Sequence, residues 1–192
     1  MTRFFLITVI GLIFMVSACE QRADSTSAQV TDSQPDWKQL LDQQLPLLGH
    51  RNWILVVDKA FPLQTSNGMT YVNSGVGLPE VLTRVLDAVD KAPHVAPILY
   101  RDAEMALLDE QLVPGVDQFK QQIDSILGNR SVQQLSHDAV FTKMAEAAAL
   151  FGVLVIKTEE TIPYSSLFIQ LDCGYWDADH ERQLRMREEA HQ

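Results

Sequence analysis

Apolar residues along this chain follow two spacings, one typical of amphipathic helices and one typical of buried strands. The expected helices span residues 37–48, 78–89, 114–127 and 137–150. The expected strands span residues 53–57, 69–72, 95–100, 131–135, 152–156 and 164–171. Strands that alternate with helices indicate right-handed crossovers. The pattern therefore predicts a single three-layer α/β domain, with a mainly parallel sheet and helices on both faces.

The first 36 residues differ in composition from the rest. A charged start and a short apolar run precede Val16-Ser17-Ala18-Cys19, which resembles the lipobox of bacterial lipoproteins. We expect a lipoprotein signal peptide over 1–18 and a lipidated Cys19 with a flexible polar tether over 19–36. The alternative is an ordinary secretory signal with a chance cysteine. Lipidation implies an envelope protein facing the periplasm, and Glu20 weakly favours the outer membrane.

The folded domain is expected over residues 37–176, followed by a charged tail over 177–192. The formal net charge of −10 disfavours nucleic acid and anionic lipid as partners, so membrane association is expected to come from the lipid anchor. Cys173, the second of two cysteines, is interpreted as a small buried thiol rather than a nucleophile. The sequence contains neither a CxxC nor an HExxH motif, so we do not expect a metal site.

Four residues at the ends of expected elements could carry chemistry. His50 precedes the strand 53–57, Asp58 follows it, His137 opens a helix and Tyr164 follows Pro163. Histidine titrates near neutral pH and can exchange protons with a substrate. Structural alternatives stay open, because a histidine can cap a helix, an aspartate can form a turn and a tyrosine can simply pack.

Two ordered motifs resemble the D-ribose pyranase and L-fucose mutarotase family. Gly49-His50, the strand ending in Asp58 and then Pro62 match its first motif, and residues 155–164 match a late turn that ends in a tyrosine. Members of that family are small α/β proteins that interconvert ring forms or anomers of free monosaccharides. The resemblance covers roughly residues 37–174.

The resemblance implies a role for each matched residue. His50 would transfer the proton, Asp58 would position it or a sugar hydroxyl, and His137 would be the second site histidine. Tyr164 and Ser166 would contact the sugar. It also implies a neutral ribose- or fucose-like monosaccharide as partner, no cofactor, and a homo-oligomer with sites between subunits.

Two positions depart from the family pattern. Glu159 replaces a glycine in the late turn, and Ser166 replaces an asparagine two residues after the tyrosine. A side chain could reshape the turn if it needs glycine conformations, and serine lacks the paired donor and acceptor of an amide. Three functions therefore remain open: a mutarotase or pyranase using His-mediated acid and base catalysis, a non-catalytic monosaccharide-binding module, and an envelope scaffold.

Overall fold

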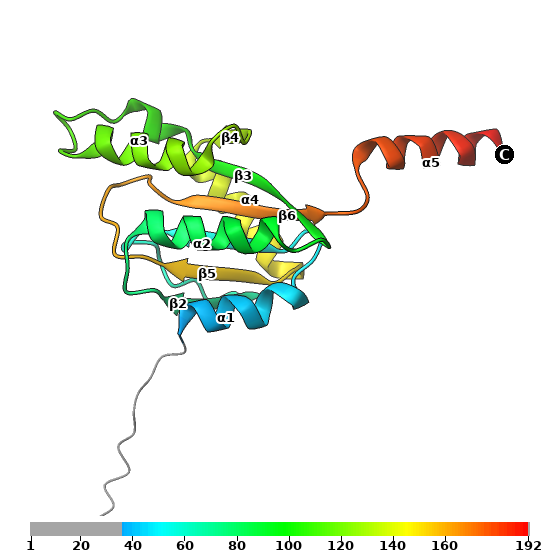
Figure 1. Ribbon diagram of the computed structural model, residues 1–192, viewed down its shortest axis with the longest axis horizontal. Helices are drawn as coiled ribbons and strands as arrows, with labels where there is room; N and C mark the ends of the chain where they lie inside the picture. Colours follow the sequence, from blue (N-terminus) through cyan, green and yellow to red (C-terminus); the bar gives the residue numbers. More distant parts are fainter. Residues whose placement is uncertain (1–35, 192) are drawn as a thin grey trace, which may run out of the picture. The chain divides into compact units, whose positions relative to one another are not determined.

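The computed structural model describes residues 36–191, which form a mixed sheet with helices on both faces (Figure 1). The helices are α1 (Trp37–Gln44), α2 (Leu78–Asp90), α3 (Val116–Leu127), α4 (His137–Leu150) and α5 (Ala178–Ala190), with two 3-10 helices, η1 (Leu45–Leu47) and η2 (Ala103–Leu107). The strands are β1 (Trp53–Val57), β2 (Met69–Asn73), β3 (Val95–Asp102), β4 (Val132–Leu135), β5 (Val153–Lys157) and β6 (Leu167–Cys173). This arrangement confirms the predicted α/β fold.

The strand order is β2-β5-β1-β6-β3-β4. β1 pairs in parallel with β5, β5 with β2, and β3 with β4, whereas β6 is antiparallel to both β1 and β3. β6 runs the other way because the chain returns from β5 through residues 158–166 without a crossover helix. One consequence is that the carboxyl ends of the parallel strands share an edge with the start of β6.

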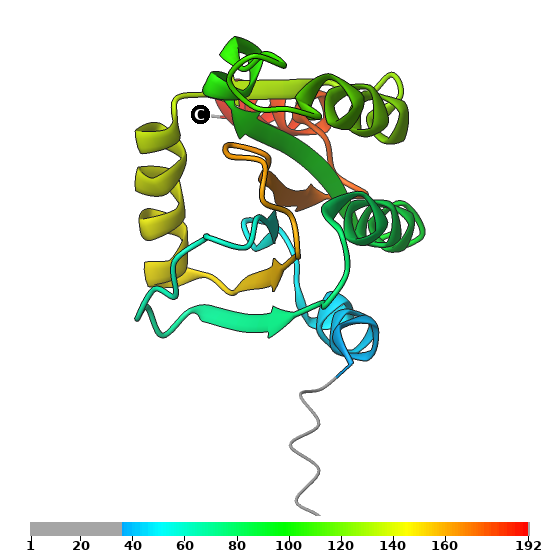
Figure 2. The same ribbon diagram turned by 90° about the vertical axis from the view of Figure 1, so that its left-hand side faces the viewer.

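Alternation along the strands divides the core into two sides. Ile54 and Val56 belong to one buried cluster, while Trp53, Leu55 and Val57 belong to the other. The first cluster includes residues of α1, α2 and α3, and the second includes residues of α4. Figure 2 shows α4 on one face of the sheet and α1, α2 and α3 on the opposite face. This is the three-layer arrangement that the periodicity predicts.

The last strand begins later than expected. The apolar run suggests a strand from 164, but β6 begins at Leu167 and continues to Cys173. Tyr164 has a φ of 57°, which is incompatible with an extended strand. The residues just before β6 therefore form a turn at the shared edge.

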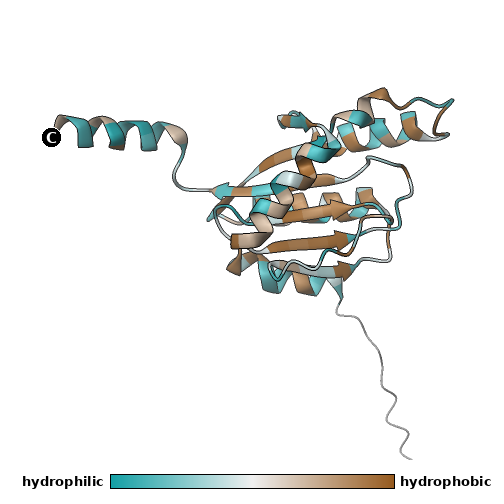
Figure 3. Cartoon of the chain, turned by 180° about the vertical axis from the view of Figure 1, so that it is seen from behind, coloured by the Kyte–Doolittle hydropathy of each residue, from teal (hydrophilic) through white to brown (hydrophobic). Residues whose placement is uncertain are grey.

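The charged tail contains α5, which has no buried residue. Asp177 caps its first turn, and Arg185 forms ion pairs with Glu181 and Glu188. In Figure 3 most residues of this helix have the hydrophilic colour, whereas most residues of the strands have the hydrophobic one. Local capping and i to i+4 pairs, rather than a buried face, stabilise this helix.

The expected signal peptide, Cys19 and almost all of the expected tether lie outside the described residues. Within residues 36–191, no helix has the length and apolar character needed to span a bilayer.

Candidate functional site

The shared edge of the sheet gathers polar side chains from distant parts of the chain. Asp58 directly follows β1, Asp102 ends β3, and His137 begins α4 just after β4. Tyr164 and Ser166 precede β6, which starts where the parallel strands end. Open α/β sheets place ligands beyond the carboxyl ends of their strands. This edge is therefore the candidate site.

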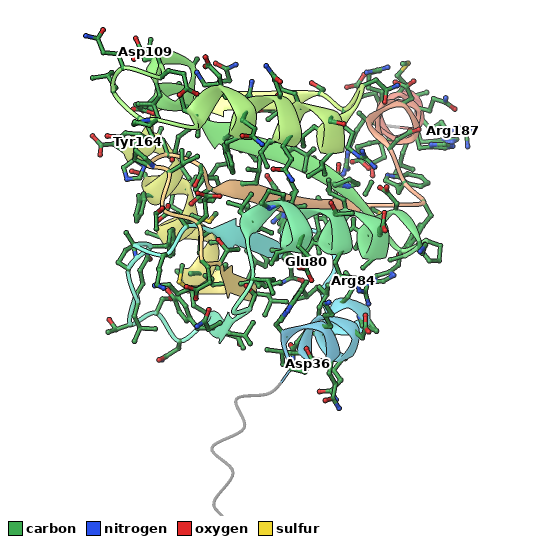
Figure 4. The ribbon with its side chains drawn as sticks, turned by 60° about the vertical axis from the view of Figure 1, so that its left-hand side comes forward. Asp36, Glu80, Arg84, Asp109, Tyr164 and Arg187 are labelled. Carbon is green, nitrogen blue, oxygen red and sulfur yellow. The ribbon has the colours of Figure 1, made fainter. Side chains whose placement is uncertain are left out.

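A cavity of about 270 Å³ lies at this edge. The polar part of its lining consists of Asp58, His137, Tyr164 and Ser166. The label of Tyr164 in Figure 4 marks this edge of the sheet. The apolar part of the lining consists of Ala60, Phe61, Pro62, Phe141, Pro163 and Phe168. A few polar groups among apolar and aromatic walls are typical of small-molecule sites. The structure thus brings four of the predicted site residues together.

Ser166 fixes the carboxylate of Asp58. The Ser166 hydroxyl donates to Asp58 Oδ2 at 2.9 Å and accepts the backbone N–H of Asp58 at 3.1 Å. Asp58 Oδ1 accepts the N–H of Ala60 at 2.8 Å. Ser166 is buried, with 2% of its surface exposed. Its hydroxyl is thus engaged with Asp58, and Asp58 is the residue of this pair better placed to meet a ligand.

His137 is held by contacts on several sides. Its Nδ1 lies 3.1 Å from Asp102 Oδ2, and its backbone N–H donates to both carboxylate oxygens of Glu104 at 3.1 Å. The ring of Phe141 lies at 4.7 Å between centroids, and the ring of Tyr164 meets it edge-on at 5.3 Å. A histidine confined in this way presents its remaining nitrogen in a defined direction.

Two carboxyl groups near His137 have opposite pKa shifts. Burial raises the pKa of Asp102, the hydrogen bond and charge of His137 act to lower it, and the negative charges of Glu104 and Asp58 raise it further. The pKa of Glu104 is lowered, chiefly because its carboxylate accepts the backbone N–H of His137. Burial thus opposes ionisation at Asp102, whereas hydrogen bonding favours it at Glu104.

Tyr164 occupies a left-handed backbone conformation that few residues with a side chain adopt. Arg51 is the other non-glycine residue with positive φ in the part of the chain that the structure describes. Strain of this kind concentrates at functional sites, where the surrounding structure enforces it. Here it places the tyrosine ring against His137 and beside the cavity.

His50 lies at the other end of β1, away from this cavity. Its Nδ1 lies 2.7 Å from Asp172 Oδ1, and the side chain is half-exposed. All five residues of β1, at about 3.3 Å each, separate it from Asp58. The expectation that Asp58 positions His50 is therefore not met within one chain. The proton-transferring role of His50 stays a prediction.

A second hollow, of about 640 Å³, surrounds His50. Arg51, Asp172 and Cys173 contribute to its wall from the sheet side, and Trp176 and Glu181 from the segment leading into and forming α5. Cys173 is partly buried and forms no disulfide within residues 36–191. It is the last residue of β6, but it is less buried than the expected small buried thiol.

Glu159 does not reshape the cavity. It is not among the residues that line the cavity, and its φ is not in the left-handed region. Its backbone N–H donates to the carbonyl of Val76 at 2.9 Å, and its side chain pairs with Lys59. The turn therefore accommodates glutamate without the conformational freedom of glycine.

Sequence reasoning missed Asp102 and Glu104. Both follow an apolar strand at its carboxyl end, as Asp58 does, and this common position was the available signal. The expected strand ended at residue 100, before both of them. In the structure β3 extends to Asp102, and that residue is 2% exposed.

Comparison with known proteins decides the family. Residues 38–174 match the RbsD / FucU transport protein family, a span of more than two thirds of the chain. The chain belongs to this family. No curated protein matches the chain in sequence.

Solved structures of RbsD and FucU proteins are similar to this chain. Bacillus subtilis RbsD complexed with D-ribose is 18% identical with a TM-score of 0.51, over 72% of this chain and 93% of that one. FucU from Bifidobacterium longum is 20% identical with a TM-score of 0.48, over 71% and 91%. The fucose mutarotase of Streptococcus pneumoniae in complex with L-fucose is 18% identical with a TM-score of 0.46, over 74% and 94%. The likeness to the B. subtilis protein shows a common fold.

Proposed function

We propose that this RbsD / FucU family protein interconverts the ring forms or anomers of a neutral monosaccharide at the cavity beside His137. The observation that carries the proposal is the convergence of Asp58, His137 and Tyr164 on one cavity in a member of this family. The structures of two relatives are complexes with D-ribose and L-fucose, which supports a free monosaccharide as the substrate.

The cavity contains the groups that this reaction needs. Mutarotation removes a proton from the anomeric hydroxyl and delivers one to the ring oxygen, so that the ring C–O bond breaks and a carbonyl forms. Reclosure from the other face of the carbonyl, or through another hydroxyl, reverses both transfers. His137 serves as the proton-transferring group in this cavity, while Asp58 and Tyr164 bind sugar hydroxyls. The reaction requires no cofactor.

The apolar side of the cavity complements this chemistry. Phe61, Phe141 and Phe168 face the same space as the polar groups. The C–H faces of a sugar ring pack well against aromatic rings, while its hydroxyls need directed partners. An uncharged sugar also suits a cavity whose titratable neighbours, Asp58 and Asp102, are acidic.

His50 enters the proposal through a second copy of the chain. The family resemblance implies sites between subunits, and His50 lies at the end of the sheet opposite the cavity. In a homo-oligomer, His50 of one subunit would approach the cavity of its neighbour and supply the second proton-transferring group. Its half-exposed ring supports this arrangement, because no burial within its own chain prevents such a contact.

The proposal also includes the cellular location of the protein. With Cys19 lipidated, the domain is tethered in the cell envelope and faces the periplasm, with the outer membrane weakly preferred. Its substrate would then be a sugar outside the cytoplasm.

Saturation-transfer NMR of anomeric protons tests the activity with D-ribose, L-fucose and D-galactose. We expect exchange faster than in buffer for at least one sugar. Sugar-dependent thermal stabilisation without faster exchange would instead indicate a non-catalytic binding module. This alternative stays open because the Ser166 hydroxyl is already hydrogen-bonded to Asp58. If no sugar shows either faster exchange or thermal stabilisation, the envelope scaffold is the function that remains.

A further inference from the structure

Asp102 is a buried carboxyl group behind the candidate site. It is the last residue of β3, in register with Leu135 on β4, and the preceding residue Arg101 is in register with Leu167 on β6. It is 2% exposed and does not line the cavity. Asp102 therefore has no direct access to a ligand in the cavity, and any effect on the reaction must pass through another residue.

The hydrogen-bond pattern around Asp102 points to His137. Asp102 Oδ2 lies 3.1 Å from His137 Nδ1, whereas Oδ1 has no hydrogen-bond partner among residues 36–191. Burying a carboxyl group is unfavourable, and the negative charges of Glu104 and Asp58 increase the penalty. When Asp102 is ionised, its carboxylate can only accept hydrogen bonds, so the contact with Nδ1 then requires the proton to be on Nδ1.

Capping of α4 does not account for Asp102. The Ser136 hydroxyl accepts the N–H of Ala139 at 3.4 Å, and the Glu104 carboxylate accepts the N–H of His137. Those two residues satisfy free donors of the first helical turn without help from Asp102. The interaction of Asp102 is with the imidazole ring alone, which is the reacting part of His137.

The contact with Asp102 determines whether the other ring nitrogen of His137, Nε2, carries a proton. A proton on Nδ1 leaves a neutral imidazole with an unprotonated Nε2, which can accept a proton. The His137 side chain is 44% exposed and borders the cavity, and no hydrogen bond of Nε2 exists within the described part of the chain. Phe141 and Tyr164 hold the ring in place.

We propose that Asp102 is a positioning residue that holds the proton of neutral His137 on Nδ1 and thereby keeps Nε2 free to take the anomeric proton of a sugar. The role in the reaction rests on the proposed function, but the protonation of the ring can be measured without any sugar. The charged and titratable groups that face this pair are Glu104 on η2, Asp58 after β1 and Tyr164 before β6.

Long-range ¹H–¹⁵N correlation spectra of the full-length protein test the proposal. At a pH where the imidazole ring is neutral, the wild-type spectrum should show His137 protonated on Nδ1. Asp102→Asn keeps the size of the side chain but provides an amide that can donate to Nδ1, so the proton should move to Nε2. The matched control is Asp124→Asn, which removes an exposed carboxylate that pairs with the neighbouring Arg101.

Sugar exchange supplies the second measurement. Asp102→Asn should lower kcat at least tenfold and change KM less than threefold, while Asp124→Asn should leave both unchanged. The proposal is overturned if wild-type His137 carries its proton on Nε2, a result that needs no variant to fold. It is also overturned if folded Asp102→Asn retains kcat within twofold. If the wild type exchanges no sugar, the proposed reaction fails, and the spectra alone still decide whether Asp102 sets the tautomer.

Discussion

Nδ1 of His137 lies 3.1 Å from Oδ2 of Asp102, and this contact joins the first residue of α4 to the last residue of β3. The two residues are 35 positions apart in the chain. They meet because β3 and β4 are parallel neighbours whose carboxyl ends share an edge, and α4 begins just after β4. The sheet, rather than a flexible loop, thus fixes the position of the imidazole.

The pH dependence of stability should report the burial of Asp102. Because the folded-state pKa of Asp102 is raised, the folded protein holds this proton at pH values where the unfolded chain has lost it. Ionisation of Asp102 is therefore harder in the folded protein, and it lowers the free energy of unfolding as the pH rises above about 4. Asp102→Asn cannot ionise, so its melting temperature should rise relative to that of the wild type as the pH increases from about 4. Asp124→Asn should show no such trend, and a difference for Asp102→Asn that shrinks with rising pH would contradict the assignment.

Ser166→Ala should destabilise the protein by about 1–3 kcal/mol, because it leaves the partly buried N–H of Asp58 without its acceptor. Urea unfolding measures the change. Ser165 offers a matched control, since its buried hydroxyl has no hydrogen-bond partner in the described region. Ser165→Ala should therefore be neutral or stabilising. Equal losses in the two variants would show that the contact with Asp58 is not what makes Ser166 important.

Tyr164→Phe should weaken sugar binding while leaving the fold intact. The ring that meets His137 edge-on is kept, so the free energy of unfolding should change by less than about 0.5 kcal/mol. Loss of the hydroxyl should raise KM about tenfold if it binds the sugar, which corresponds to roughly 1.4 kcal/mol. Steady-state exchange measurements give KM, and Tyr175→Phe, at an exposed position, is the control. An unchanged KM would remove Tyr164 from the list of sugar contacts.

Periodicity of the sequence predicted the secondary structure well because helices α1 to α4 bury residues at helical spacing and the central strand β1 is a short apolar run buried on both faces. Ile54 and Val56 alternate with Leu55 and Val57 onto two different sides of the core. The expected strand started at residue 164, whereas β6 starts at Leu167, because the backbone of Tyr164 is left-handed and cannot continue a strand. Backbone conformation of that kind depends on tertiary contacts that a pattern does not contain.

The candidate site was predictable only where residues stand near strand ends. Asp58, His137 and Tyr164 were found by that criterion together with the family resemblance, and they line one cavity. Asp102 was missed because the strand was expected to stop at 100, which moved this residue out of the sheet. His50 and Asp58 flank the same strand at opposite ends, so within one chain they lie apart although they are close in sequence.

Complementation between variants tests the site between subunits. His50→Ala and His137→Ala should each be inactive alone, because every site lacks one of the two histidines. When the two variants are co-expressed, a mixed oligomer should contain sites with both histidines, in about a quarter of interfaces if assembly is random. Exchange measurements on the purified mixture should then recover up to that fraction of wild-type activity. Recovery no greater than the sum of the separate variants would contradict a site shared between copies.

The most direct test of the central claim compares anomeric exchange in wild-type protein and in His137→Ala. Saturation-transfer NMR with D-ribose and L-fucose should show protein-dependent exchange that falls at least about 100-fold in His137→Ala, as expected for loss of an acid or base group. His180→Ala, which alters an exposed histidine on α5, should match the wild type. Exchange that is equal in wild type and His137→Ala, or no faster with wild type than in buffer, would contradict sugar ring chemistry at this cavity.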